Sequence, residues 1–198
     1  MICLEGPSPA RSSARSTEVE ATPACYRPCA FYVKWAWSDW ESEQAMALRR
    51  AVFCSEQGIF LGDDRDAIDA QAQLLVAVSV LGGAPDAVVG TVRIHQAASG
   101  LWWGSRLAVH PCFRHFGHIG STLIRLAVGS AHARGCRSFL AHVQRQNVPL
   151  FERLHWNRLH PVIVHGRAHC LMQADLASYP PCADPYAGFV ACAAEARR

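Results

Sequence analysis

The sequence predicts an α/β domain with a mixed central β-sheet flanked by helices. Two observations indicate this fold class. In the first half of the chain, apolar runs at 74–81 and 87–95 are separated by Gly82-Gly83, which is typical of a β-hairpin. In the second half, a strand, a glycine-containing loop, a helix and a further strand follow one another, which favours an α/β crossover. A hairpin followed by such a crossover predicts a sheet with both antiparallel and parallel neighbours.

Composition divides the chain into three parts. Residues 1–28 are rich in Ser, Ala, Pro and Arg without any period, and we expect them to be a disordered leader. Residues 29–179 carry the regular patterns and are expected to form the domain. Residues 180–198 open with Pro180-Pro181 and end in Ala and Arg, and we expect them to be a C-terminal tail.

The first elements are a strand, a helix and a loop. A β-rich run covers 31–37, and Ser38 with Glu41 forms a capping box, which begins a helix by satisfying its free N–H groups. The helix is supported by apolar residues at helical spacing, namely Ala45, Leu48 and Val52. The acidic segment 56–70 is expected to be a loop.

The later elements alternate. A strand is predicted over 101–109 and ends at Pro111. A helix beginning near Ile119 is expected to stop before Gly135, because glycine commonly ends helices. The remaining patterns predict a strand at 138–143, a short helix at 147–156 and two closing strands at 162–164 and 170–174.

Composition excludes several classes of protein. Of 198 residues 51% are hydrophobic, and the formal net charge is only +3 with 19 scattered basic residues. A nucleic-acid-binding protein usually shows a denser basic stripe, so no nucleic-acid partner is predicted. The sequence contains no run of about 18 apolar residues, so no membrane span is predicted. It also has no apolar segment near the N-terminus that would indicate a secretory signal. A cytoplasmic location is therefore expected.

Cysteine usage indicates a reducing compartment. There are nine cysteines, an odd number, and no two have the C-x-x-C spacing. We expect free thiols and no structural disulfide. No Cys/His quartet has zinc-site spacing, and the ten histidines are irregularly spaced, so no metal is predicted.

The loop between the strand at 101–109 and the following helix is the main candidate for chemistry. Glycines let backbone N–H groups face outward, and the start of a helix adds about half a positive charge. Together they favour an anion such as a pyrophosphate, although such a loop can also be a simple turn.

This region resembles the coenzyme A signature of the GNAT (GCN5-related N-acetyltransferase) superfamily, Val-x-Pro-x-x-Arg-x-x-Gly-x-Gly. Val109, Pro111, Arg114 and Gly117 keep the spacing, whereas Gly120 comes one residue late. The resemblance implies the GNAT fold. It also implies coenzyme A contacts from the strand end and the loop, that is from Leu107, Ala108, Val109, Arg114, His115, Phe116, Gly117, His118, Ile119, Gly120 and Ser121.

A second segment, 147–156, resembles the superfamily's Asn…Phe-Tyr-Glu-Lys-Leu-Gly-Phe helix. Asn147 corresponds to an asparagine that often contacts the cofactor. Phe151 stands where many members carry a tyrosine acting as general acid, and His155 replaces the usual glycine. Phe151 is therefore expected near the cofactor, without acid function.

Across 31–179 the chain is similar to one subfamily, the nitrogen-starvation GNAT proteins found beside a nitrilase gene. The similarity lies in 48–58, 64–69, 102–109, 143–147 and 166–172. It implies no particular acceptor.

The resemblance implies transfer of an acetyl group from acetyl-CoA to an amine of a small molecule by direct attack. Glu56 and His169 are the candidate bases, since a protonated amine must lose a proton before it attacks. The acceptor side is expected to contain Arg49, Asp66, Asp69 and Trp103. Of Trp102 and Trp103, which must point to opposite faces of a strand, one should be core and the other should line a pocket.

Several alternatives stay open. Glu56 could pair with Arg49, the acidic loop could be solvated, and His169 could be a core residue. The chain could be a non-catalytic acyl-CoA-binding or regulatory module, or an acyltransferase like the autoinducer synthases. The sequence leaves the oligomeric state, including a homodimer, undecided.

Overall fold

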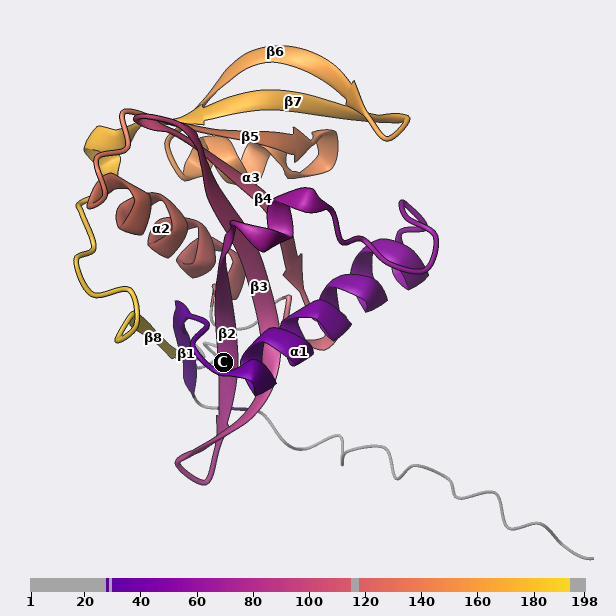
Figure 1. The fold of residues 1–198 in the computed structure, drawn as a ribbon, viewed down its shortest axis with the longest axis vertical. Helices are drawn as coiled ribbons and strands as arrows, with labels where there is room; N and C mark the ends of the chain where they lie inside the picture. The colour runs from indigo at the N-terminus through magenta and orange to yellow at the C-terminus, as the bar shows by residue number, and fades with distance from the viewer. Residues whose placement is uncertain (1–27, 29, 115–117, 193–198) are drawn as a thin grey trace, which may run out of the picture.

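The computed structural model describes residues 28, 30–114 and 118–192, which form one twisted sheet with helices on both faces (Figure 1). Residues 1–27, most of the expected leader, lie outside this description. The described strands are ordered β6-β7-β5-β4-β3-β2-β1-β8. All neighbours are antiparallel except β4 and β5, which pair in parallel. The predicted fold class, a mixed α/β sheet, is confirmed.

The first half forms the antiparallel part of the sheet. Its strands are β1 (Ala30–Trp35), β2 (Gln73–Leu81), β3 (Ala84–Ala98) and β4 (Leu101–Val109). Alternate residues of β2 belong to the cores on opposite faces of the sheet, with Leu75 and Ala77 on one face and Val76 and Val78 on the other. The run at 74–81 is continuously apolar because both of its faces are covered.

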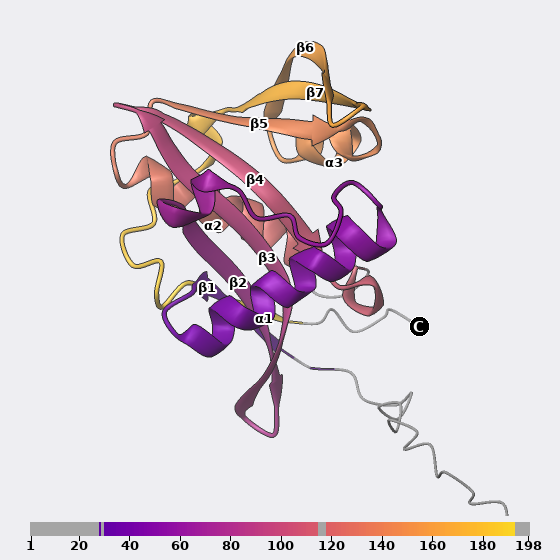
Figure 2. The ribbon, with the colours of Figure 1, turned by 45° about the vertical axis from the view of Figure 1, so that its right-hand side comes forward.

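Helix α1 (Asp39–Arg49) begins at the predicted capping box, where Ser38 Oγ accepts the N–H of Glu41. It continues as a π-helix over Arg50–Glu56, which the sequence analysis did not predict. Within the expected acidic loop, Ala67–Ala70 forms one 3₁₀ turn capped by Asp66. Figure 2 shows α1 lying across one face of the sheet, and the acidic loop runs on this side from the end of the helix back to β2.

Helix α2 (Ile119–His132) covers the opposite face and packs against the larger core. Its close approach depends on Gly90 of β3, where a Cβ atom would lie 2.7 Å from Ile119 Cγ2 and 3.0 Å from Leu123 Cδ1. Gly90 therefore sets the distance between this helix and the sheet.

The chain then forms β5 (Ser138–Gln144), α3 (Val148–Arg153), β6 (Trp156–Val164) and β7 (Arg167–Ala174). Between α3 and β6, His155 takes a left-handed conformation with φ 61° at the position where the family usually has glycine. Helix α3 therefore ends at Arg153, three residues before the predicted end of the short helix at 147–156.

The segment after Tyr179, which was predicted to be a tail, packs against the domain and joins the sheet through its last residues, up to Cys192. Cys182 N donates to Gly129 O on α2 (2.9 Å), and Trp35 N donates to Pro185 O (2.8 Å). Strand β8 (Phe189–Cys192) then pairs with β1 as an edge strand.

Candidate active site

Strands β4 and β5 separate in the middle of the sheet. Their parallel pairing runs from Leu101 opposite Ser138 to Gly104 opposite Ala141, and beyond this point the two strands diverge (Figures 1 and 2). A β-bulge in β4 accompanies the separation, because Val92 on β3 lies opposite both Arg106 and Leu107, and Arg106 has φ 56°. A bulge bends its strand, and here it turns β4 away from β5.

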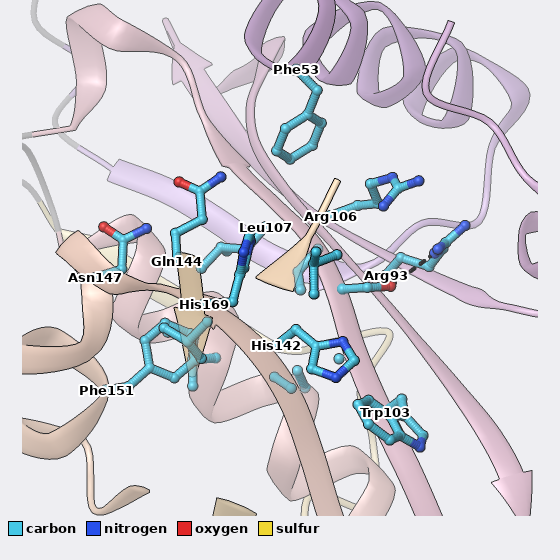
Figure 3. A pocket seen from close by; sticks show the side chains of 18 of the residues that line it. Phe53, Arg93, Trp103, Arg106, Leu107, His142, Gln144, Asn147, Phe151 and His169 are labelled. Carbon is cyan, nitrogen blue, oxygen red and sulfur yellow. Dashed lines mark hydrogen bonds between the residues drawn. The ribbon is translucent and has the colours of Figure 1, made fainter. Parts of the chain in front are cut away.

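A pocket of about 470 Å³ occupies this fork (Figure 3). One of its walls is apolar and belongs to the α2 face of the sheet. This wall includes Gly104 of β4, Ala141 and Val143 of β5, Phe151 of α3 and Trp156 of β6. Phe151 is buried and makes an edge contact with Trp156, with 5.0 Å between ring centroids.

The other wall lies on the α1 face and carries polar and aromatic side chains. The described lining there includes Phe60, His95, Trp103, His142 and His169. Trp103 packs against His142 with 5.0 Å between ring centroids, whereas Trp102 is buried in the core. The expectation that one tryptophan is core and the other lines a pocket is confirmed.

Three arginines and three aspartates form an ion-pair network beside this wall, and all of its members except Asp66 are largely buried. Arg49 Nε lies 2.8 Å from Asp64 Oδ2, and its Nη1 lies 2.7 Å from Asp69 Oδ1. Arg93 Nη1 contacts Asp66 Oδ1 at 2.6 Å and Asp69 Oδ2 at 2.8 Å.

Arg106 completes this network. Its Nε lies 2.9 Å from Asp64 Oδ2, and its Nη2 lies 3.1 Å from Asp66 Oδ2. Three positive and three negative charges balance, so these carboxylates are already paired with cations. Every carboxylate among them is held by two arginines.

The predicted acceptor residues are therefore separated by the structure. Asp66 and Trp103 line the pocket, whereas Arg49 and Asp69 do not. Arg49 is fully buried, and its partners are Asp64 and Asp69 rather than Glu56. Burial raises the pKa of Asp69, but hydrogen bonds from Arg49, the Asp66 backbone and Arg93 outweigh it and hold that pKa well below its ordinary value.

Glu56 lies away from the pocket lining. Its Oε2 accepts a hydrogen bond from Arg114 Nη2 at 2.6 Å, and Arg114 Nε donates to Val109 O at 3.1 Å. The hydrogen bond from Arg114 lowers the pKa of Glu56. A carboxylate with a lowered pKa and a guanidinium partner is a weak base, so Glu56 is positioned as the ion-pair partner of Arg114 rather than as a free carboxylate.

His169 does line the pocket, on β7 opposite Gln144 of β5. Its Nδ1 is 2.9 Å from Arg167 O. His142, His95 and Arg93 also line the pocket and were not among the residues predicted from the sequence. The alternation of β5 was the available signal, since Phe139, Ala141 and Val143 are apolar and His142 lies between two of them on the other face.

The end of β4 offers backbone groups to the fork. His110 N donates to Val89 O on β3, and Ala108 is paired with Thr91. Since the N–H groups of a strand alternate in direction, those of Leu107 and Val109 point away from β3 and toward the open side. Asn147, at the start of α3, lines the pocket across the fork (Figure 3).

The N-terminus of α2 follows β4 closely. Thr122 N donates to His118 O (2.9 Å), so the N–H groups of Ile119, Gly120 and Ser121 are the first-turn donors of the helix. His118 has φ 50°, and Ser121 Oγ donates to His118 O (2.7 Å). His115, Phe116 and Gly117, which were also assigned to the cofactor, lie outside the described residues.

A sheet whose one parallel pair opens around a pocket, beside a helix N-terminus, is the architecture of acyltransferases that use acyl-CoA. The acetyltransferase (GNAT) family model matches residues 29–156, about two thirds of the chain. The chain belongs to this family. No curated protein matches the sequence.

Solved structures share the fold. A putative N-acetyltransferase from Lactobacillus plantarum is 23% identical, with 73% of this chain and 97% of that one covered and a TM-score of 0.65. Escherichia coli ElaA is 16% identical over 73% and 98% of the two chains, with a TM-score of 0.61. The AHL synthase LasI is 13% identical over 77% and 95%, with a TM-score of 0.59.

Within the described residues, no helix has the length and apolar character needed to cross a membrane. No group of three or more His, Cys, Asp or Glu side chains in the same part of the chain is arranged to hold a metal ion. The cysteines described there, Cys54, Cys112, Cys136, Cys170, Cys182 and Cys192, are free.

Proposed function

We propose that this protein transfers an acetyl group from acetyl-CoA to an amine of a small molecule by direct attack. The observation that carries the proposal is the fork between β4 and β5. It leaves the N–H groups of Leu107 and Val109 on the open side of β4, and the N-terminus of α2 lies beside the same end of β4, where Gly120 approaches Val109. These are the two kinds of donor that an acyl-CoA needs, one along its pantetheine arm and one at its pyrophosphate.

The chain's own groups have distinct tasks in this proposal. The first turn of α2 and Arg114 bind the pyrophosphate. Leu107 and Val109 pair with the pantetheine amides as a strand would, and one of these N–H groups stabilises the developing oxyanion. Asn147 and Phe151 contact the arm from the opposite side of the fork.

The amine nitrogen attacks the thioester carbon, the C–S bond breaks, and the thiolate leaves. Phe151 replaces the family's tyrosine acid, and Tyr179 is buried with its hydroxyl bonded to Leu154 O and Trp156 Nε1. A thiol is already acidic, with a pKa of about 8.5, so its thiolate can leave without a dedicated acid.

Within the family, we assign the chain to the nitrogen-starvation subfamily on the residues quoted above, and to the cytoplasm on its cysteine usage. The proposed partner is a small-molecule amine. The one carboxylate in the described pocket lining, Asp66, is paired with arginines, so this wall offers no unpaired carboxylate to attract a cationic amine.

A panel of acyl-CoAs and amines, assayed by release of free thiol, tests the function. Turnover of acetyl-CoA with at least one amine supports it. Coenzyme A binding by calorimetry without turnover for any pair would favour a non-catalytic acyl-CoA-binding or regulatory module. Absence of both would remove the proposal.

The second candidate is an acyltransferase with a longer acyl donor, like the autoinducer synthases. It is favoured by the apolar wall, because the pocket extends past Gly104 to Ile124, Ala127 and Phe139 on the α2 face. A pocket reaching core side chains can hold an acyl chain. Higher kcat/KM with hexanoyl-CoA or longer donors than with acetyl-CoA would favour this candidate.

Replacing Glu56 by Gln is expected to weaken coenzyme A binding several-fold, because the ion pair that orients Arg114 is lost. The effect should appear mainly in KM for the acyl donor, with a smaller fall in kcat. Steady-state kinetics with the donor varied and calorimetry check this. A fall in kcat of about a hundredfold with unchanged donor affinity would instead identify Glu56 as the base.

A further inference from the structure

His142 occupies the first position of β5 beyond its last pair with β4, which is Ala141 opposite Gly104. Its side chain projects to the α1 face, opposite to the buried neighbours Ala141 and Val143. The ring packs against Trp103 and lines the pocket (Figure 3). No hydrogen bond joins either of its ring nitrogens to any residue in the described part of the chain.

The carboxylates near the fork are engaged elsewhere. Asp66 is the one carboxylate in the described pocket lining, and it bonds Arg93 at 2.6 and 3.1 Å and Arg106 at 3.1 Å. Glu56 bonds Arg114 outside the lining. The acceptor side therefore needs a base of another kind, and histidine is the side chain suited to that task near neutral pH.

We propose that His142 is the catalytic base of the transfer, accepting the proton that the attacking amine loses. The inference rests on the proposed function. As the new C–N bond forms and the C–S bond breaks, the N–H proton passes to an unprotonated ring nitrogen of His142. The coenzyme A thiolate then takes a proton from solvent, and His142 returns its proton to solvent.

The surroundings favour the neutral form of His142. Burial lowers the pKa of His142, and the charges of His169 on β7 and His160 on β6 lower it further. The other charged and titratable groups of the pocket lining come from β3, β4, the acidic loop and the β6–β7 hairpin; they are Arg93, His95, Arg106, Asp66 and His165. Around neutral pH the imidazole is therefore ready to take up a proton.

The test compares His142→Gln with the wild type. With an alkylamine acceptor, kcat is expected to fall about a hundredfold or more, while coenzyme A affinity and melting temperature stay unchanged. The wild-type kcat should rise with pH through an apparent pKa below about 6.5, the ordinary histidine value, and this limb should vanish in the variant.

Two further variants sharpen the test. His155→Asn changes an exposed histidine. The backbone of His155 is left-handed, a conformation that asparagine tolerates, so this variant should match the wild type. His169→Gln removes a neighbouring charge and should move the acid limb to higher pH. Wild-type turnover that persists in His142→Gln with its pH limb intact would overturn the base assignment alone. A wild type that releases no thiol with any amine would overturn the proposed function as well.

Discussion

Replacing Arg49 by Met is expected to lower the free energy of unfolding by about 3–5 kcal/mol, because it removes one member of a buried charge network. The Arg49 side chain is fully buried and supplies hydrogen bonds to both Asp64 and Asp69. Asp64, also fully buried, would keep only Arg106 as its cation. Urea denaturation should detect the loss, and the melting temperature should fall by roughly 10 °C.

The adjacent residue provides the matched control. Arg50 lies 3.9 Å from Asp63, and both side chains are more than 40% exposed. Arg50→Met should therefore change stability by less than about 1 kcal/mol. The stability of Arg49→Lys should lie between those of Arg49→Met and Arg50→Met, since an ammonium keeps the charge but cannot bond both aspartates as a guanidinium does. Equal stability of Arg49→Met and Arg50→Met would contradict the structural role of the network.

The same network predicts how stability depends on pH. The pKa values of Asp66 and Asp69 are lowered by their arginine partners in the folded protein. The folded state thus binds fewer protons than the unfolded chain at low pH. The stabilisation that these two carboxylates contribute is complete above their unfolded pKa of about 3.9. It is lost as the pH falls through their lower pKa values in the folded protein. Removal of Arg49 should flatten this dependence.

Local patterns predicted the elements that depend on local chemistry. The capping box at Ser38 and Glu41 fixed the start of α1, and the continuous apolar run of β2 indicated burial on both faces. The strand, loop and helix around 101–132 could be predicted because strands and helix ends are marked by patterns of only a few residues, such as the glycine that follows this helix. The signature around Arg114 then indicated the family.

The features that position the site depend on residues far apart in sequence. Arg106 reaches Asp64 and Asp66 across about forty positions, so nothing near Arg106 indicates its partners. The bulge at Arg106 has no glycine to mark its positive φ. Strand β8 follows a proline-rich stretch and forms because β1 offers an open edge, which no pattern within 180–198 reveals.

Replacing Gly120 by Glu is expected to weaken coenzyme A binding by a hundredfold or more, about 2.7 kcal/mol. Gly120 lies in the first turn of α2, where the proposal places the pyrophosphate. A Cβ at this position would meet only Val109 Cγ2, at an ordinary 3.8 Å, and the backbone is not in the left-handed region. The substitution should therefore leave the fold intact, and calorimetry should report the loss of affinity.

Two variants at Gly120 separate charge from bulk. Gly120→Ala adds only the Cβ that the structure accommodates, so it should bind coenzyme A within a few-fold of the wild type. Gly120→Gln has nearly the shape of glutamate without its charge and should be intermediate, since it obstructs the donors but does not repel phosphate. A glutamate near a helix N-terminus also favours the helix, so the melting temperature of Gly120→Glu should not fall. If that variant binds coenzyme A as tightly as the wild type, the pyrophosphate lies elsewhere, and the first turn of α2 is only the start of a helix.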